Sequence, residues 1–214
     1  MKILIACEIS GRVRDAFIEK GHDAWSCDIL DPKNFPKMME GQKYREKHIT
    51  ADALVVIDDD WDMIIAHPVC TYLSNSGAKH LYRGMNKKNG INPVRWKNME
   101  YAARFFKKFL DAPAKKKAVE NPIIHGHAKA LIGRGPSQII QPWWFGHKEM
   151  KATGLWLDGL PPLVHTNNVG PPPKDANERL KWAKIHRMAP GPDRQMLRSL
   201  TFAGIADAMA EQWG

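Results

Sequence analysis

Two short segments of the chain combine side chains that could take part in covalent chemistry. Cys70 lies in HPVCT, directly after the apolar run WDMIIA, and Glu120 and Asn121 come near the end of the stretch KKAVENP. A cysteine thiolate is a strong nucleophile, and a carboxyl group can transfer a proton or stabilise charge during the attack. A cysteine considered by its type alone is more often a small apolar core residue. The placement of Cys70 and Glu120 after strand-like runs favours a catalytic role.

The runs that precede these residues have the pattern of buried strands. Residues 2–6 (KILIA) and 61–66 (WDMIIA) are short and almost continuously apolar, as in strands covered on both faces of a parallel sheet. Residues 116–122 (KKAVENP) predict a third, short strand, and Pro122 prevents its continuation in the sheet. Further strands are predicted at residues 22–29, 137–141 and 153–157.

Helical patterns alternate with these strands. Apolar residues recur at helical spacing after residue 12 and, most clearly, over residues 94–112, and helices are also predicted at residues 175–186 and 205–213. This alternation predicts an α/β fold with a mostly parallel sheet and helices on both faces. The carboxyl ends of the strands would then bring together Glu8, Asp28, Asp52, Cys70 and Glu120.

Three stretches lack a clear period. Residues 32–49 predict a surface loop or an irregular short helix, and residues 158–173, rich in Pro and Gly, predict no regular element. Residues 72–96 are too long for an ordinary connection, and such loops are usually functional or disordered, so a lid or substrate loop is one interpretation. Lys87 and Lys88 within it are most simply solvated surface residues, with phosphate contact as the alternative.

The composition limits the class of protein. A chain of 214 residues is long enough for one well-buried core, and we expect a single domain over residues 1–214. The formal net charge of +9 favours a polyanionic partner such as nucleic acid. Three cysteines without CxxC spacing, and the pair His125 and His127 without further ligands, predict neither a disulfide scaffold nor a metal site. This use of cysteine favours a reducing cytosol. No stretch approaches the roughly 18 apolar residues of a membrane helix, so a soluble, cytoplasmic protein is expected.

The order of the motifs resembles that of the DNA cytosine-C5 methyltransferases. A loop with Pro and Cys follows WDMIIA, ENP follows a strand, and RSLTFAGIADAMAEQW lies at the C-terminal end. The chain is more closely similar to short phage and bacterial proteins described as cytosine-methyltransferase-like, which share HPxCTYLxNSG, ENPI, QPWxFG and GIADAMAxQWG. This resemblance spans nearly the whole chain. It implies a Rossmann-like S-adenosylmethionine-dependent methyltransferase fold and a place in a bacterial or phage-infected cell.

The resemblance also implies a role for particular residues. Cys70 would add to C6 of cytosine, Glu120 would stabilise the charge that this creates at N3, and Asn121 would fix the loop. Lys151 is the one residue that keeps a positive charge where the larger enzymes have two arginines. Because the base is stacked in duplex DNA, it would have to be flipped out or presented on a single strand. The residues implied to bind S-adenosylmethionine are Glu8, Ser10, Gly11, Asp28, Asp52, Ser199, Thr201 and Gly204.

Departures from the family pattern leave other functions open. Val69 replaces a proline that would stiffen the loop, and the missing arginines require another contact to the cytosine carbonyl, for which Arg134 is a candidate. A catalytically weak or inactive protein that binds DNA or the cofactor is therefore the first alternative. Residues 158–194 form a reduced insert in place of a target-recognition domain, which leaves methylation of a free pyrimidine nucleotide as another. Asp28 and Asp52 have the simpler interpretation of turn or helix caps.

Overall fold

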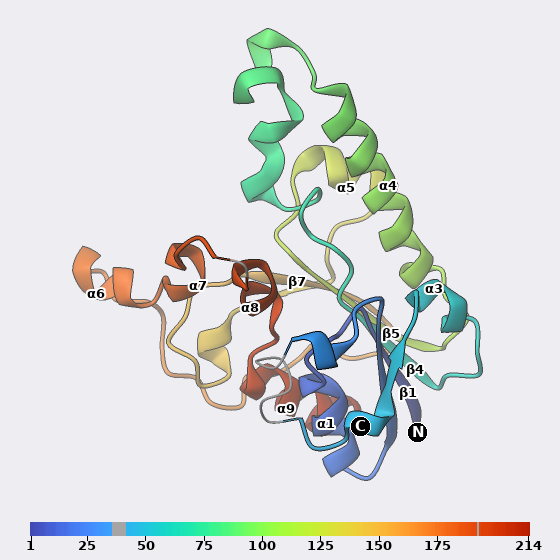
Figure 1. The fold of residues 1–214 in the computed structure, drawn as a ribbon. Coiled ribbons are helices and arrows are strands. Elements are labelled where there is room, and N and C mark those ends of the chain that lie inside the picture. The colour runs from blue at the N-terminus through green and yellow to red at the C-terminus, as the bar shows by residue number, and fades with distance from the viewer. Residues whose placement is uncertain (36–41, 192) are drawn as a thin grey trace.

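A seven-stranded sheet forms the centre of the computed structural model, which describes residues 1–35, 42–191 and 193–214 (Figure 1). The strand order is β3-β2-β1-β4-β5-β7-β6, and β7 alone runs antiparallel to its neighbours in this described sheet. The strands are β1 (Lys2–Ala6), β2 (Asp23–Asp28), β3 (His48–Thr50), β4 (Met63–Ala66), β5 (Lys116–Pro122), β6 (Gln138–Ile140) and β7 (Thr153–Asp158).

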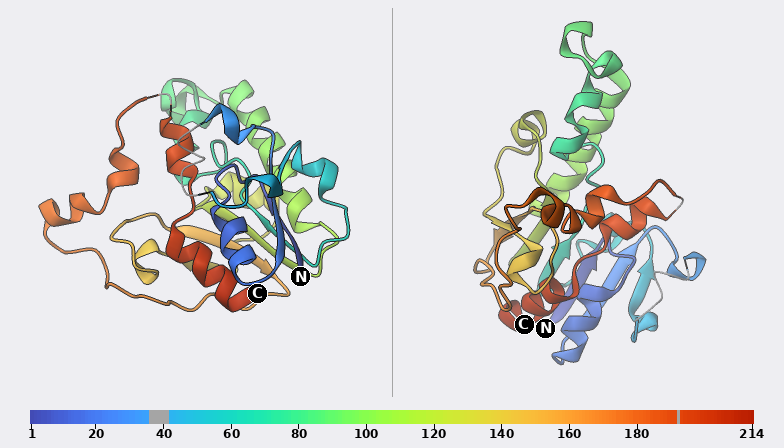
Figure 2. Two further views of the ribbon diagram at one scale, coloured as in Figure 1. Left: turned by 60° about the horizontal axis from the view of Figure 1, so that its bottom comes forward. Right: turned by 90° about the vertical axis from the view of Figure 1, so that its left-hand side faces the viewer.

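Helices cover both faces of this sheet (Figures 1 and 2). Ile3 and Ile5 of β1 pack in one apolar cluster with α1 and α9, whereas Leu4 and Ala6 pack in a second cluster with α3, α4 and α5. The apolar run of β1 is continuous because both of its faces are buried. The predicted Rossmann-like α/β class is thus confirmed by the topology. The helices are α1 (Arg12–Glu19), α3 (Ala53–Val56), α4 (Pro93–Leu110), α5 (Gly126–Ile132), α6 (Ala176–Lys181), α7 (Lys184–Arg187), α8 (Arg194–Ser199) and α9 (Ala203–Trp213).

The longer predicted elements are confirmed, whereas several short ones were not predicted. β3, α3, α5 and α8 have three to seven residues each, too few to establish a period. The helix predicted at residues 175–186 is divided into α6 and α7, because buried Trp182 leaves the helix and its carbonyl oxygen accepts a hydrogen bond from Met150. Residues 36–41 of the irregular segment lie outside the described residues. Among the described helices, none combines the length and hydrophobicity needed to cross a membrane.

The long segment after Cys70 forms an ordered arm that projects from the sheet together with α4 (Figures 1 and 2). We call residues 75–97 the arm. Its first part consists of three 3-10 turns, and it returns to α4 through an isolated bridge between Tyr82 and Ile91. Leu81 is fully buried, and its carbonyl oxygen accepts a hydrogen bond of 2.8 Å from the backbone nitrogen of Asn92. The predicted functional or disordered loop is therefore a packed element.

The strand order of the sheet reverses at β1, although β1, β2 and β4 all run parallel. β1 pairs with β2 on one side and with β4 on the other, so the connections that follow β1 and β4 depart in opposite directions. Open α/β sheets bind their ligands in the crevice at this position. The topology thus places a binding site beyond the ends of β1, β2, β4 and β5.

The contact between α9 and the loop before β7 yields a test of packing. A Cβ atom added at Gly204 would lie 2.1 Å from the carbonyl oxygen of Phe145, a backbone atom that cannot move cheaply. We expect Gly204→Ala to lower the free energy of unfolding by about 2 kcal/mol, measured by urea denaturation. Gly126→Ala is the matched control, because no described atom lies within 4 Å of a Cβ added there. Equal stability of the two variants would contradict this packing.

Candidate active site

A cleft of about 1700 Å³ opens along the carboxyl edge of the sheet. The ends of β1, β2, β4 and β5 line it, together with the segment around α8 and the base of the arm. Gly11, Asn121 and Gly204 do not line the cleft and lie behind its surface. The other predicted site residues all line it: Glu8, Ser10, Asp28, Asp52, Cys70, Glu120, Lys151, Ser199 and Thr201.

Glu120 faces His67 across the parallel pair of β4 and β5. Ala66 pairs with Val119, so the next residue of each strand emerges at the same level of the edge. Nδ1 of His67 lies 3.3 Å from Oε2 of Glu120, and both side chains are largely buried. Burial raises the pKa of Glu120, but the hydrogen bond from His67 and the charge of Lys151 outweigh it and hold the pKa below its ordinary value. Glu120 is therefore a carboxylate at neutral pH.

Asn121 connects β5 to the loop that contains Cys70. Its side chain is fully buried, and Nδ2 donates a hydrogen bond of 3.0 Å to the carbonyl oxygen of Pro68. Since Asn121 follows Glu120 directly, one strand end holds both the carboxylate and the loop opposite it. A buried amide with a backbone partner restricts the movement of that loop.

Cys70 begins a tight turn in the floor of the cleft. Its carbonyl oxygen accepts hydrogen bonds from the backbone nitrogens of Leu73 and Ser74, at 3.0 and 2.9 Å. Burial raises the pKa of the Cys70 thiol, and the negative charge of Glu120 raises it further, whereas Lys151 and Arg198 oppose the shift. The net shift is upward, so Cys70 is a protonated thiol at neutral pH in the free protein.

Lys151 connects the loop before β7 to the end of α8, and both of these segments line the cleft. Nζ donates hydrogen bonds to the carbonyl oxygens of Arg198 and Leu200, at 3.1 and 3.5 Å. These bonds hold the segment after α8 close to β5, while the ammonium charge acts on both Glu120 and Cys70. Lys151 thus combines a structural contact with an electrostatic effect on the two reactive groups.

The two aspartates on the opposite side of the cleft both cap backbone groups. Oδ1 of Asp28 accepts a hydrogen bond of 2.9 Å from the nitrogen of Leu30, and Oδ1 of Asp52 accepts one of 3.0 Å from Leu54 at the start of α3. Burial raises the pKa of Asp28, as does the charge of Glu8. Ile29 beside Asp28 is 71% exposed and presents an apolar surface to the cleft. The capping interpretation and a ligand role are therefore compatible.

Glu8 closes the N-terminus of α1. Its carboxylate accepts hydrogen bonds from the backbone nitrogens of Val13 and Arg14, at 2.8 and 3.3 Å. Gly11 precedes the helix with a φ of +67°, and a Cβ there would meet the guanidinium of Arg14 at 2.1 Å. Helix N-termini often bind the anionic groups of ligands, but here a side chain of the protein occupies that position.

His67 and Arg198 are site residues that sequence reasoning did not select. The available signal for His67 was its position at the end of a buried strand, three residues before Cys70. Arg198 carried no comparable signal, because only the folded chain brings α8 over the cleft.

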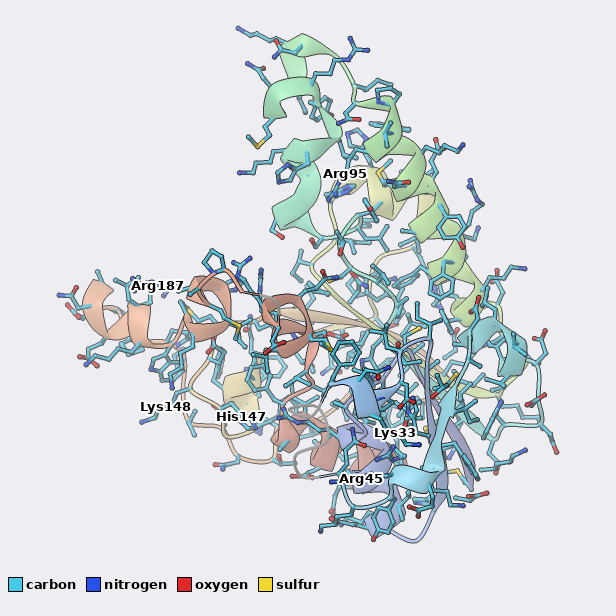
Figure 3. The ribbon with its side chains drawn as sticks, in the orientation of Figure 1. Lys33, Arg45, Arg95, His147, Lys148 and Arg187 are labelled. Atoms are coloured by element: carbon cyan, nitrogen blue, oxygen red, sulfur yellow. The ribbon has the colours of Figure 1, made fainter. Side chains whose placement is uncertain are left out.

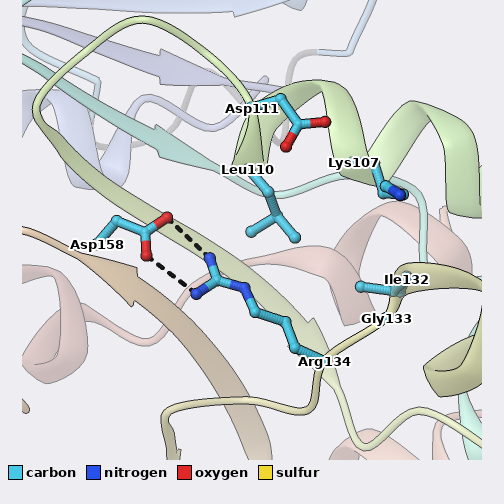
Figure 4. A pocket seen from close by; sticks show the side chains of 7 residues that line it. All are labelled: Lys107, Leu110, Asp111, Ile132, Gly133, Arg134 and Asp158. Carbon is cyan, nitrogen blue, oxygen red and sulfur yellow. Dashed lines mark hydrogen bonds and ion pairs between the residues drawn. The ribbon is translucent and has the colours of Figure 1, made fainter.

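Arg134, the predicted contact to a cytosine carbonyl, lies at the wrong edge of the sheet. Its guanidinium makes two hydrogen bonds to the carboxylate of Asp158, at 3.0 and 2.8 Å (Figure 4). Asp158 pairs with Lys117 near the start of β5, whereas Glu120 pairs with Leu155 towards the other end. Because β7 runs antiparallel to β5, Asp158 at the end of β7 lies at the edge of the sheet opposite the cleft, and Arg134 is bound there.

No protein-family model and no curated protein sequence matches the chain. Among solved structures, a methyltransferase from Entamoeba histolytica is similar with a TM-score of 0.42 and 14% identity, over 78% of this chain and 57% of that one. An antibiotic-related methyltransferase is similar with a TM-score of 0.39 and 11% identity, over 74% of this chain and 87% of that one. The chain spans little more than half of the first structure. The function proposed below rests on the cleft.

The electrostatic coupling of Cys70 and Glu120 is testable by thiol reactivity. Glu120→Gln removes the charge that raises the pKa of Cys70, so more thiolate is present at neutral pH. We expect alkylation of Cys70 by iodoacetamide, followed by peptide mass spectrometry, to become several-fold faster. Glu100→Gln makes the same change on α4 and is the control that should leave the rate unaltered. A slower or unchanged rate in Glu120→Gln would refute the coupling.

Proposed function

We propose that this protein transfers a methyl group from S-adenosylmethionine to C5 of cytosine in DNA, through a transient bond between Cys70 and the base. The observation that carries the proposal is the convergence of Cys70, Glu120 and Lys151 in one cleft with Asp28 and Asp52 opposite them. A nucleophile, a buried carboxylate and a positive charge on one side of the cleft suit attack on an electron-poor ring. The acidic strand ends suit a ligand with hydroxyl and amino groups.

Cys70 supplies the nucleophile for this reaction. Its sulfur loses a proton and adds to C6, which breaks the double bond between C5 and C6 and moves electron density to C5. S-adenosylmethionine, when bound, supplies an electrophilic methyl group, which C5 accepts. Loss of the C5 proton to a base then restores the double bond, and the bond between C6 and sulfur breaks to release Cys70.

Glu120 balances the charge of the addition step. The free protein holds Cys70 as a thiol and Glu120 as a carboxylate, so transfer of the thiol proton through Glu120 to N3 adds sulfur and hydrogen across the ring without net charge. Once Glu120 is protonated, its negative charge no longer raises the pKa of Cys70, so the thiolate is easier to form. When the bond between C6 and sulfur breaks, the proton returns from N3 through Glu120 to the sulfur of Cys70. His67 orients the carboxylate through the bond to Oε2.

The residues opposite Cys70 fit the cofactor. The carboxylate of Asp28 can accept hydrogen bonds from ribose hydroxyls, and exposed Ile29 next to it offers an apolar face for the adenine ring. Asp52 can accept a bond from the adenine amino group. Glu8 already fills the N-terminus of α1, so its negative charge suits the ammonium group of the methionine part better than the carboxylate.

A second candidate is a protein that binds the cofactor or DNA without turnover. Three observations favour it: the thiol of Cys70 is protonated at rest, Lys151 is engaged by backbone carbonyls, and Val69 leaves the nucleophile loop without a stiffening proline. Cofactor binding in the absence of methyl transfer distinguishes this candidate from the first.

The covalent mechanism predicts that Cys70→Ala abolishes methyl transfer. We expect no incorporation of tritiated methyl groups into unmethylated DNA by this variant, while calorimetry shows that it still binds S-adenosylmethionine. Cys27→Ala is the control, since Cys27 is fully buried in the core and does not line the cleft, and it should keep its activity. Equal incorporation by Cys70→Ala and the parent protein would exclude a covalent bond to Cys70.

The cofactor site predicts a specific loss at Asp28. Asp28→Asn removes the charge that accepts the ribose hydroxyls, so the dissociation constant for S-adenosylmethionine, measured by calorimetry, should rise about ten- to a hundredfold. Asp60→Asn makes the same change at an exposed position outside the cleft and should leave the constant unaltered. Unchanged affinity in Asp28→Asn would remove Asp28 from the site.

A further inference from the structure

The positive charge of the chain is concentrated in the arm. Six Lys and Arg residues lie between positions 75 and 97, and no Asp or Glu lies anywhere between Asp62 and Glu100. The arm therefore carries +6 of the formal net charge of +9, although it makes up only about a tenth of the chain. The six residues are Lys79, Arg83, Lys87, Lys88, Arg95 and Lys97.

These charges are accessible and are not neutralised by the protein. All except half-buried Arg95 are exposed, and within the described part of the chain none of the six forms an ion pair. By contrast, the exposed lysines Lys20 and Lys43 each pair with a carboxylate. The arm is thus a cluster of positive charges, on the described surface, that an external anion can reach.

The arm is held in a defined position rather than hanging freely. The hydroxyl group of Tyr82 lies 2.9 Å from Nε2 of His127 on α5, and the ring of Trp96 lies 5.0 Å from the ring of His127. Together with buried Leu81, these contacts fix the arm against α4 and α5. A charged surface that is already ordered loses little conformational entropy on binding.

The arm and the candidate nucleophile belong to one continuous cleft. Tyr82, Met85 and Arg95 of the arm line the same cavity as Cys70. At the base of the arm, Arg95 points from α4 towards the facing segment (Figure 3), and its Nη2 donates a hydrogen bond to the carbonyl oxygen of Thr71, the residue after Cys70. This hydrogen bond connects the arm to the loop that contains Cys70.

We propose that the arm is the docking surface for the phosphodiester backbone of DNA and guides a base to Cys70. The role of the guided base rests on the function proposed above. The six charges are distributed over three successive 3-10 turns and the start of α4, so they occupy several separate positions. DNA presents many phosphates along its backbone, whereas a free nucleotide presents its phosphate at one point. The spread of charge therefore favours a polymeric acceptor. The arm then positions the DNA, a task for which the reduced insert at residues 158–194 is short.

Charge reversal at the tip of the arm tests this assignment. Lys87→Glu/Lys88→Glu and the control Lys107→Glu/Lys115→Glu change the net charge equally, but the control residues lie near the start of β5, at the opposite edge of the sheet. Binding of a labelled DNA duplex and of the corresponding single strand is measured by fluorescence anisotropy over a range of salt concentrations. We expect the arm variant to bind about tenfold more weakly or worse, with a salt slope lower by about two, and the control to bind within about twofold of the parent.

The outcomes separate this inference from the proposed activity. Equal effects of the two variants, or no measurable DNA binding by the parent protein, would overturn the docking surface. Lys87→Gln/Lys88→Gln repeats the test without introducing negative charge. If DNA binding depends on the arm but methyl transfer does not depend on Cys70, the docking surface is supported and the proposed reaction is refuted. If methyl transfer depends on Cys70 but DNA binding does not depend on the arm, the proposed reaction is supported and the docking surface is refuted.

Discussion

The parallel register of β4 and β5 is the constraint on which the site depends. Because Ala66 pairs with Val119, His67 and Glu120 lie side by side at the carboxyl edge of the sheet, and the loop after His67 brings Cys70 into the same cleft. Asn121, one residue further along β5, ties that loop down. A shift of one residue would turn Glu120 to the other face of the sheet and would break both connections. The chemistry proposed for the cleft therefore depends on backbone pairing more than on any single side chain.

The cleft and the arm differ in the balance of their charges. Four carboxylates, those of Glu8, Asp28, Asp52 and Glu120, line the cleft together with the basic side chains of Lys151, Arg194 and Arg198, whereas the arm contains only positive charge. A polyanion is therefore attracted to the arm, while the carboxylates of the cleft favour an uncharged base or a cofactor with a positive charge. This difference is a physical reason for a base to leave the backbone path and enter the site.

Several residues of the site also stabilise the local fold. Glu8 and Asp52 cap α1 and α3, and Lys151 binds backbone carbonyls. Polar groups at the ends of strands and helices are needed to satisfy free backbone N–H and C=O groups, and those same ends form the edge where ligands bind. A substitution at such a position therefore needs a stability measurement beside each binding measurement.

The sequence by itself determined which segments become buried strands and the long helix α4, because continuous and helically spaced apolar residues record burial directly. It also determined that Cys70 follows one strand and that Glu120 lies near the end of another, and hence that they share an edge. The tertiary structure alone decided that β7 runs antiparallel, so that Asp158 at its end binds Arg134 away from the cleft, and that His67 meets Glu120. It also decided that the Gly- and Lys-rich segment after Cys70 folds into a rigid arm. These outcomes depend on contacts between residues far apart in the chain, and local periodicity carries no record of such contacts.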